Sequence, residues 1–296
     1  MSTTLICDGF TTSGFLDGKK LCLTNYSASF RKNLMQSNAA LKHGVSVNNL
    51  TRTKGPYIQD VPTISCEISF EPDETLFDTI ISKIIDTRNS KFSVLLNDSS
   101  SGIDWLFDES YVESFSFGVS KDSILSMGMS FFVVPNTISY TWGNRKNISL
   151  GDTSLPIEKP IPYYDWKILQ GDETEMKDTL DFSFSFNQPI TPKYSCSGTN
   201  EPIAPGASHL LFGLPTIEFG ITSLMAKSDN LDLSKDNQGT NYNIKEDLDN
   251  DCLSFYIKDK FKFKLTGLTE LEKTPSFDGT PSMKTTYSVH GVWKTK

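Results

Sequence analysis

The stretch Pro62-Thr63-Ile64-Ser65-Cys66-Glu67-Ile68-Ser69-Phe70 alternates apolar and polar residues from Ile64 onward. Apolar side chains at every second position are typical of a β-strand with one buried face. The alternation returns in Leu180-Asp181-Phe182-Ser183-Phe184-Ser185-Phe186, where apolar residues align with apolar ones at an offset of 180 − 64 = 116 residues. Two such strands predict that the chain contains a duplicated β module.

The composition predicts a folded protein that is mainly β with a minor α part. Of the 296 residues, 37% are hydrophobic, and the 20 Phe and 10 Tyr favour strands. The length is sufficient for two domains, each with a core of its own. The formal net charge of −8 argues against a protein that grips nucleic acid by its phosphates, although DNA could pass such a surface without binding.

The cysteine pattern and the N-terminus both indicate a protein made in a reducing compartment. The cysteines are odd in number, widely spaced and without a C-x-x-C pair, which argues against a disulfide framework and a zinc site. No basic start followed by an apolar run is present, so we expect no signal peptide. No apolar run approaches the ~20 residues of a membrane helix. The five cysteines are Cys7, Cys22, Cys66, Cys196 and Cys252.

A first module is predicted at residues 21–134, after an irregular N-terminal arm at residues 1–20. A strand at 21–30 is followed by a polar segment at 31–61, which is too long for a hairpin loop of ~2–5 residues. Further strands are expected at residues 64–70, 92–96, 111–119 and 125–133, the last two joined by a turn at 120–123. A helix is predicted with Asp73 as its N-cap and an apolar stripe of Leu76, Phe77, Ile80, Ile81, Ile84 and Ile85.

A linker rich in Gly and Pro is predicted at residues 135–162, and a second module at residues 163–296. Residues 261–265 match residues 115–119 at an offset of 261 − 115 = 146, which places an insertion of 146 − 116 = 30 residues between the repeated strands. A flanking helix is unclear in this module, because the apolar segment 209–214 is short and contains Gly213. Strands are expected at residues 163–169, 180–186, 261–265 and 283–293.

The sequence contains no recognisable catalytic or metal-binding motif, so we expect no enzyme activity, no cofactor and no metal. Two acidic segments, residues 229–239 and 245–251, depart from the spacing of a calcium loop and are interpreted as solvated loops. The histidines have no partner at metal or catalytic spacing. They are His43, His209 and His290.

A lysine-rich strand is expected to present its charged side to solvent. Lys260, Lys262 and Lys264 alternate with Phe261, Phe263 and Leu265. Lysines on one face of a strand also discourage unwanted pairing at its edge.

The order of elements resembles that of the tail-tube family of long-tailed bacteriophages and related injection machines. The resemblance rests on the strand at 21–30, the long segment 31–61, the strand at 64–70, the helix at 76–85, and the closing strands at 111–119 and 125–133. The second module matches at its strands and departs at its helix and in its short early connection, residues 170–179. The resemblance implies two tandem β-sandwich or barrel modules, each with a helix on its flank.

The same resemblance implies a structural virion protein that forms the tail tube. Family members with tandem modules assemble as trimeric rings with pseudo-sixfold symmetry, and the rings stack around a lumen that conducts DNA. The implied partners are other copies of the chain and tail proteins such as the tape measure, baseplate or terminator, with no membrane and no specific DNA binding. The implied location is the virion tail, after synthesis in the host cytoplasm. Matching polar faces, Ser65, Glu67 and Ser69 with Asp181, Ser183 and Ser185, would then turn toward the channel.

Three alternatives stay open. A tube-initiating, baseplate-hub or distal-tail protein of the same machine uses the same module but makes a single ring. A two-domain β-sandwich adhesin or carbohydrate-binding protein would use exposed aromatic residues to stack on sugar. An enzyme is the third, since paired carboxylates need not be close in sequence. The aromatic residues considered for sugar binding are Trp105, Trp142, Trp166 and Trp293.

Overall fold

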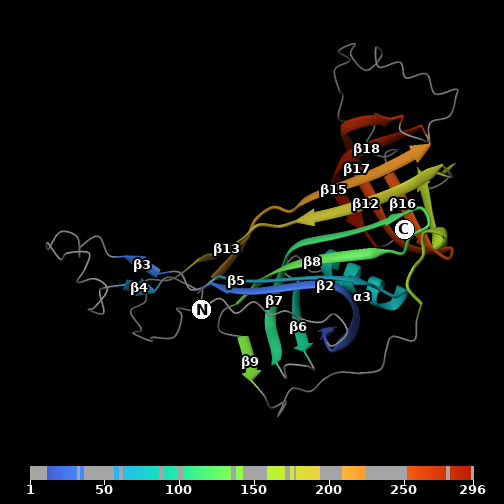
Figure 1. Cartoon of the computed structure of the whole chain (residues 1–296). Coiled ribbons are helices and arrows are strands. Elements are labelled where there is room, and N and C mark those ends of the chain that lie inside the picture. Colours follow the sequence, from blue (N-terminus) through green and yellow to red (C-terminus); the bar gives the residue numbers. More distant parts are fainter. Residues whose placement is uncertain are drawn as a thin grey trace.

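The computed structural model describes residues 12–31, 34–36, 57–59, 63–86, 90–98, 103–134, 138–142, 159–170, 174–176, 178–193, 209–224, 252–277 and 281–294. Within these residues the protein is mainly β, as predicted, with a single α-helix. Fourteen strands form one antiparallel sheet, and two short hairpins accompany it (Figure 1).

Six strands of the first half close into a barrel, because each pairs with two others in the order β1-β2-β5-β8-β7-β6 and back to β1. Residues 12–16 belong to this barrel, which corrects the expectation of an irregular arm over residues 1–20. β1 is too short to display an alternating pattern in the sequence. Its pairing with β2 and β6 in the structure identifies it as a strand. The barrel strands are β1 (Thr12–Leu16), β2 (Lys19–Arg31), β5 (Thr63–Glu71), β6 (Lys91–Asp98), β7 (Ile103–Ser120) and β8 (Ser126–Val133).

The long strand β7 connects the barrel to the rest of the sheet. Its first part pairs with β6 on one edge and with β9 (Ile138–Trp142) on the other. From Ser114 onward it pairs with β8 on one edge and with β12 (Thr179–Asn187) on the other. Residues 135–162 are therefore more than a linker: β9 extends the sheet, and Pro160 and Pro162 form isolated bridges to the first half.

The second half repeats the strand order of the barrel. Its strands follow one another as β10-β16-β17-β18-β15-β12, and the corresponding path in the first half is β1-β6-β7-β8-β5-β2. A short strand, β11, pairs with β10 and precedes β12 in the chain, as the start of β2 pairs with β1. The remaining bounds are β10 (Trp166–Gln170), β11 (Thr174–Glu175), β15 (Thr216–Leu224), β16 (Cys252–Ile257), β17 (Lys260–Ser276) and β18 (Ser282–Trp293).

This order disagrees with the predicted equivalence of residues 64–70 and residues 180–186. In the sheet, β5 lies between β2 and β8, whereas β12 lies between β15 and β7. The place of β5 is taken in the second half by β15, and that of β2 by β12. Alternation alone could not distinguish these strands, because every half-buried strand of an antiparallel sheet alternates.

Two hairpins occupy equivalent places in the chain. β3 (Leu34–Gln36) pairs with β4 (Tyr57–Gln59) between β2 and β5, and these two stand at the end of the molecule away from the helix (Figure 1). β13 (Ile190–Lys193) pairs with β14 (His209–Phe212) between β12 and β15. Residues 209–212 are thus a strand and not the start of a helix. The segment 225–251, between β15 and β16, lies outside the described residues.

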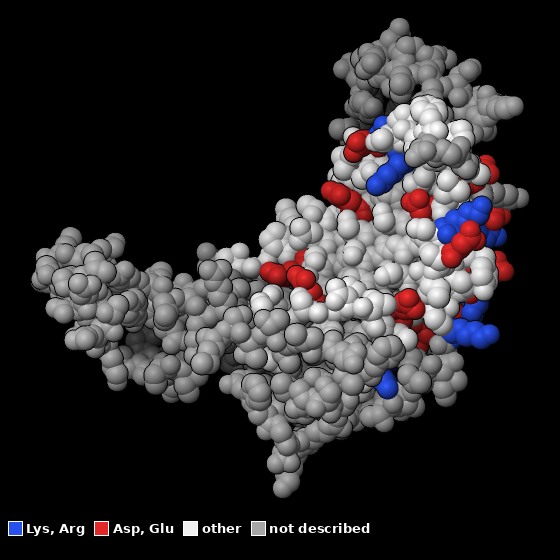
Figure 2. All heavy atoms as spheres, in the orientation of Figure 1, with Lys and Arg blue, Asp and Glu red and all other residues white. Residues whose placement is uncertain are grey.

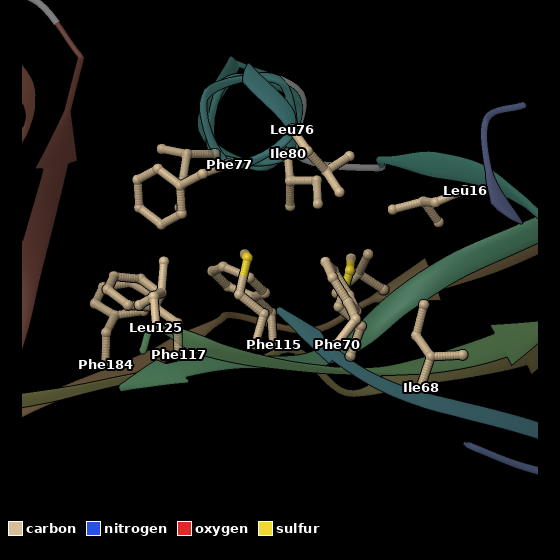
Figure 3. Close-up of a cluster of buried hydrophobic side chains, with 14 of the residues drawn as sticks. Leu16, Ile68, Phe70, Leu76, Phe77, Ile80, Phe115, Phe117, Leu125 and Phe184 are labelled. Atoms are coloured by element: carbon tan, nitrogen blue, oxygen red, sulfur yellow. The ribbon is translucent and has the colours of Figure 1, made fainter. Parts of the chain in front are cut away.

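The helix α3 (Glu74–Asp86) begins as predicted, because the Asp73 carboxylate accepts a hydrogen bond of 2.7 Å from the Leu76 N–H. Its apolar side lies over the sheet, with Phe77 and Ile80 directed at side chains from both halves (Figure 3). The centroid of the Phe77 ring lies 5.4 Å from the ring centroid of Phe117, 5.5 Å from that of Trp166 and 6.4 Å from that of Phe263. The buried residues of both halves form one hydrophobic cluster, so the two expected separate cores are a single core.

The lysine-rich strand differs from its prediction at Lys262. A β-bulge in the pairing of β16 with β17 leaves Tyr256 opposite Phe261 and Phe255 opposite Phe263. The extra residue, Lys262, turns toward the helix, where its side chain is only 4% exposed. Its ammonium group lies 2.6 Å from the Glu74 carboxylate and 2.8 Å from that of Asp78. The ion pairs fasten the second half to the helix of the first.

Candidate functional site

The side of the sheet opposite the helix carries mostly small polar residues over seven consecutive strands. In β5, β7, β8, β12 and β15 these residues alternate with mostly buried apolar ones, such as Cys66, Ile68 and Phe70 in β5. We call this set the polar face. It comprises Asn25, Ser27, Ser29, Ser65, Glu67, Ser69, Ser126, Gly128, Ser130, Ser114, Ser116, Gly118, Ser120, Asp181, Ser183, Ser185, Asn187, Thr216, Glu218, Gly220, Thr222, Lys284, Thr286 and Ser288.

The strand register aligns these residues in rows that cross both halves. Because paired residues of neighbouring strands project to the same side, each row is a continuous line of side chains. The joint between β7 and β12 does not interrupt the rows. One runs Ser27, Glu67, Ser130, Ser114, Asn187, Thr216, and the next runs Asn25, Ser69, Gly128, Ser116, Ser185, Glu218, Ser288 and on to Thr269 of β17.

The charge on the polar face is sparse and mainly acidic. Glu67, Asp181 and Glu218 are its acidic members and Lys284 is its lysine, while Arg31 occupies the next position after Ser29 in the same two-residue period of β2. Hydrogen bonds hold some of these groups down on the sheet: Thr222 donates to the Asp181 carboxylate at 2.8 Å, and Ser27 donates to Glu67 at 3.4 Å. In the view of Figure 2, uncharged and acidic side chains dominate the middle of the described surface, and most basic ones lie toward one side.

Because most residues of the polar face are serine, glycine or other small residues, few long side chains project from it. The exposed face of an ordinary antiparallel sheet carries many long Lys, Arg and Glu side chains, which project into water. At Gly220 a side chain would be crowded, because an added Cβ would stand 2.9 Å from the Ser183 hydroxyl. The polar face can therefore lie along a second smooth surface or a passing polymer while offering few positions for specific contact.

An apolar cavity of about 280 Å³ lies on the other side of the sheet, between α3 and strands of both halves. Its described lining includes Ser90 and Gln188 but no charged residue. The Gln188 amide is occupied in the fold, where it donates a hydrogen bond of 3.2 Å to the Gly213 carbonyl. The described lining offers apolar contact and contains no titratable side chain. Its apolar lining includes Ile81, Ile84, Ile85, Phe115, Phe186, Phe212 and Val292.

The pKa shifts of Cys66, Glu74 and Glu113 have local causes within the fold. Burial raises the pKa of the Cys66 thiol to about 12, so this residue stays protonated and unreactive. The hydrogen bond from Lys262 lowers the pKa of Glu74, which keeps that carboxylate ionised. Burial raises the pKa of Glu113, at a bulge of β7.

Of the residues considered for chemistry, the structure describes only two histidines, and they lie in different strands. His209 lies in β14 and the exposed His290 in β18, while His43 and the acidic segments 229–239 and 245–251 lie outside the described residues. In the described part of the chain no cluster of His, Cys, Asp and Glu could hold a metal ion.

The tryptophans considered for sugar binding are mostly committed to packing. Trp166 packs against Phe77, Phe117 and Phe182, and Trp105 stacks on Phe107. Trp293 is exposed, and its indole N–H donates to the Thr266 hydroxyl at 2.9 Å. Trp105 and Trp166 are therefore committed to ring contacts within the fold, while the side chain of Trp142 lies outside those that the structure describes.

The sequence did reveal part of the polar face. Ser65, Glu67, Ser69 and Asp181, Ser183, Ser185 were expected to be polar faces, and they lie on the same side of one sheet. The contributions of β2, β7, β8, β15 and β18 to this face were missed. The signal was available as alternating Ser in residues 114–120 and 126–130, but it acquires meaning only when the strands are placed side by side.

Comparison of the sequence with models of known protein families gives no match, and a search of curated protein sequences gives none either. None of the described helical residues forms a segment long and apolar enough to cross a membrane.

Proposed function

We propose that this chain is a structural protein that assembles with copies of itself into rings, in which the polar face lines a channel. The order of elements in the chain resembles that of the tail-tube family of long-tailed bacteriophages, so the assembly that we propose is a tail tube. In that role the chain acts by shape and charge, without a catalytic site.

The observation that carries the proposal is the unbroken polar face, which crosses seven strands and both halves. A channel that conducts a polymer must not hold it. Small side chains offer few contacts, and acidic groups repel the phosphates of nucleic acid. The overall charge of −8 agrees in sign with this surface.

Negative-stain electron microscopy of the purified chain tests the assembly. The proposal predicts rings with a central opening, stacked into tubes at high concentration. Separate rings that do not stack would support the tube-initiating, hub or distal-tail role within the same machine. A chain that sediments as a monomer at high concentration, with no rings in the micrographs, would contradict both.

A charge-reversal experiment tests the channel itself. The double variant Ser116→Lys/Ser185→Lys adds two lysines at paired positions of the polar face. Particles assembled from it in the presence of short duplex DNA should protect that DNA from nuclease at low salt, and the protection should disappear as salt rises.

The matched control is Thr75→Lys/Thr79→Lys, which adds the same charge on the exposed side of α3. DNA held by these lysines would lie outside the channel and remain open to nuclease. Equal protection by the two double variants would contradict a channel lined by the polar face.

A further inference from the structure

The two halves share details of strand pairing beyond the order of strands. In the first half, β2 bulges at Thr24, since Leu23 pairs with Phe70 but Asn25 with the adjacent Ser69. In the second half, β12 bulges at Leu180, since Thr179 pairs with Ser223 but Asp181 with Thr222. The bulged residues are 180 − 24 = 156 positions apart, and their partners are 222 − 69 = 153 positions apart.

A second bulge recurs in the same way. β7 bulges at Glu113, opposite Phe131 and Ser130 of β8. β17 bulges at Leu271, opposite Tyr287 and Thr286 of β18. The offset is 271 − 113 = 158 on the bulged strand and 286 − 130 = 156 on its partner.

The offset of 153 between β5 and β15 and the offset of 156 between β8 and β18 are consistent with the pairing of these strands within each half. Ser69 pairs with Gly128 in the first half, and the residues 153 and 156 positions further on, Thr222 and Lys284, pair in the second. The same tripeptide also begins the two equivalent strands, as Pro62-Thr63-Ile64 and Pro215-Thr216-Ile217. Since bulges are specific to a register, their recurrence indicates two copies of one module.

This equivalence makes the joint inside the chain a template for a joint between chains. The joint consists of the last part of β7, from the first copy of the module, and of β12, which is the second copy's equivalent of β2. The corresponding last part of β17 and the corresponding part of β2 are not joined. Among the described residues, no strand pairs with β17 beyond Thr266 on the β16 side, or with β2 beyond Leu21 on the β1 side.

We propose that residues 272–276 of one copy pair antiparallel with residues 27–31 of a second copy, in the register of β7 with β12. Ser116 lies opposite Ser185 in the template, which places Thr274 opposite Ser29. Gly118 lies opposite Ser183, which places Ser276 opposite Ser27. The rows of the polar face then continue from one chain into the next.

Charge and exposed apolar surface fit this pairing. Ser114 lies opposite Asn187 in the template, and their equivalents are Glu272 and Arg31, which carry opposite charges. Phe277 is 68% exposed, whereas its equivalent Val119, next to the joint, is 3% exposed. A neighbouring copy would cover Phe277. Pro275 has no N–H to donate, so the ladder loses at most one hydrogen bond there.

Disulfide trapping tests this interface, which rests on the proposed self-assembly. Ser29→Cys/Thr274→Cys is built in a background with Cys7, Cys22 and Cys196 changed to Ser, leaving the buried Cys66 and Cys252. Mild oxidation of assembled particles should give a ladder of covalent multimers on a non-reducing gel. The largest band would give the number of copies in the ring.

Two control variants make either outcome decisive. Ser116→Cys/Ser185→Cys reproduces the template pair and should oxidise within one chain. Ser65→Cys/Thr274→Cys moves one thiol to the next strand, beside Ser29, and should give no ladder. Rings that form while the template pair oxidises and the 29/274 pair does not would overturn this interface but leave the proposed function standing. Absence of rings would contradict the proposed function instead.

Discussion

The two halves of the chain arrange six strand positions in the same order, yet they differ in what covers the long central strand of each. The last part of β7 has β8 on one edge and β12 on the other, and its Phe115, Phe117 and Val119 are buried. The last part of β17 has β18 on one edge, and Phe277, which follows β17 and corresponds to Val119, is exposed. Burial in this protein therefore depends on the neighbouring strand as much as on the residue.

The helix contacts both halves, so the burial of its side chains also depends on neighbours from both. α3 follows β5 of the first half, but Phe77 packs on Trp166 and Phe263 of the second half as well as on Phe117. One described helix thus covers apolar residues of both halves. The second half uses the first to complete its core, which explains why one hydrophobic cluster runs through the molecule.

The largest expected effect comes from removing this shared contact. Phe77→Ala should lower the free energy of unfolding by about 3–5 kcal/mol, since the ring is fully buried. Amide hydrogen exchange should accelerate in β6 and in β16, one strand from each half. Phe92→Ala is the control, because Phe92 packs on Phe131 inside the barrel and should affect β6 more than β16. Faster exchange in β6 alone for Phe77→Ala would show that the halves do not share their core.

A smaller effect is expected from the buried lysine that joins the halves. Lys262→Met should cost about 1–2 kcal/mol, since Asp78 loses its cation and Glu74 keeps only the longer contact of 3.6 Å with Lys260, while both carboxylates remain partly in contact with water. The control Lys260→Met should change stability by less than about 0.5 kcal/mol, because Lys260 is 72% exposed. Urea denaturation of the three proteins measures both differences.

The pH dependence of this variant has a definite sign. The pKa of Glu74 is lowered in the folded protein, so its ion pair contributes fully above the ordinary carboxyl pKa of about 4.3 and is lost as the pH falls through the folded value. The gap in Tm between the natural protein and Lys262→Met should stay constant from pH 7 to about 5 and narrow below. A gap that persists at pH 3 would mean that packing of the lysine stem, and not its charge, stabilises the contact.

The smallest effect is expected at a bulge where the two halves carry different residues, Glu113 in β7 and Leu271 in β17. Burial raises the pKa of Glu113, so ionisation destabilises the folded protein once the pH exceeds the folded value. Glu113→Gln should therefore stabilise by less than about 1 kcal/mol at pH 7, with no gain near pH 4. Thermal melts at the two pH values measure this change, and equal gains at both would rule out ionisation as the cause.

Much of the local structure could be predicted from the sequence because its causes are local. The helix followed from the Asp73 cap and the apolar stripe beginning at Leu76, both of which the structure contains. The turn at residues 120–123 joins β7 and β8, with the Ser123 N–H donating to the Ser120 carbonyl. Short strands such as β1 and β11 were missed, since a few residues cannot display a period.

The candidate surface was only partly predictable, for a related reason. Alternation identified polar sides in β5 and β12, but it matched β12 of the second half to β5 of the first. In the sheet, the strand that takes the place of β5 in the second half is β15. Lys262 was expected to face solvent because its neighbours alternate, and a single bulge placed it against the helix. One inserted residue reverses the side on which a strand residue projects.

The sequence by itself determined the mainly β character, the helix with its cap, and the existence of strands with one small polar side. Each depends on neighbours a few positions away, through period, capping and side-chain size. The tertiary structure decided which strands take corresponding places in the two halves, how the polar sides join into one face, and which strand edges have no partner among the described residues. Those depend on register between strands far apart in the chain, and hydrogen bonds between distant backbones set it.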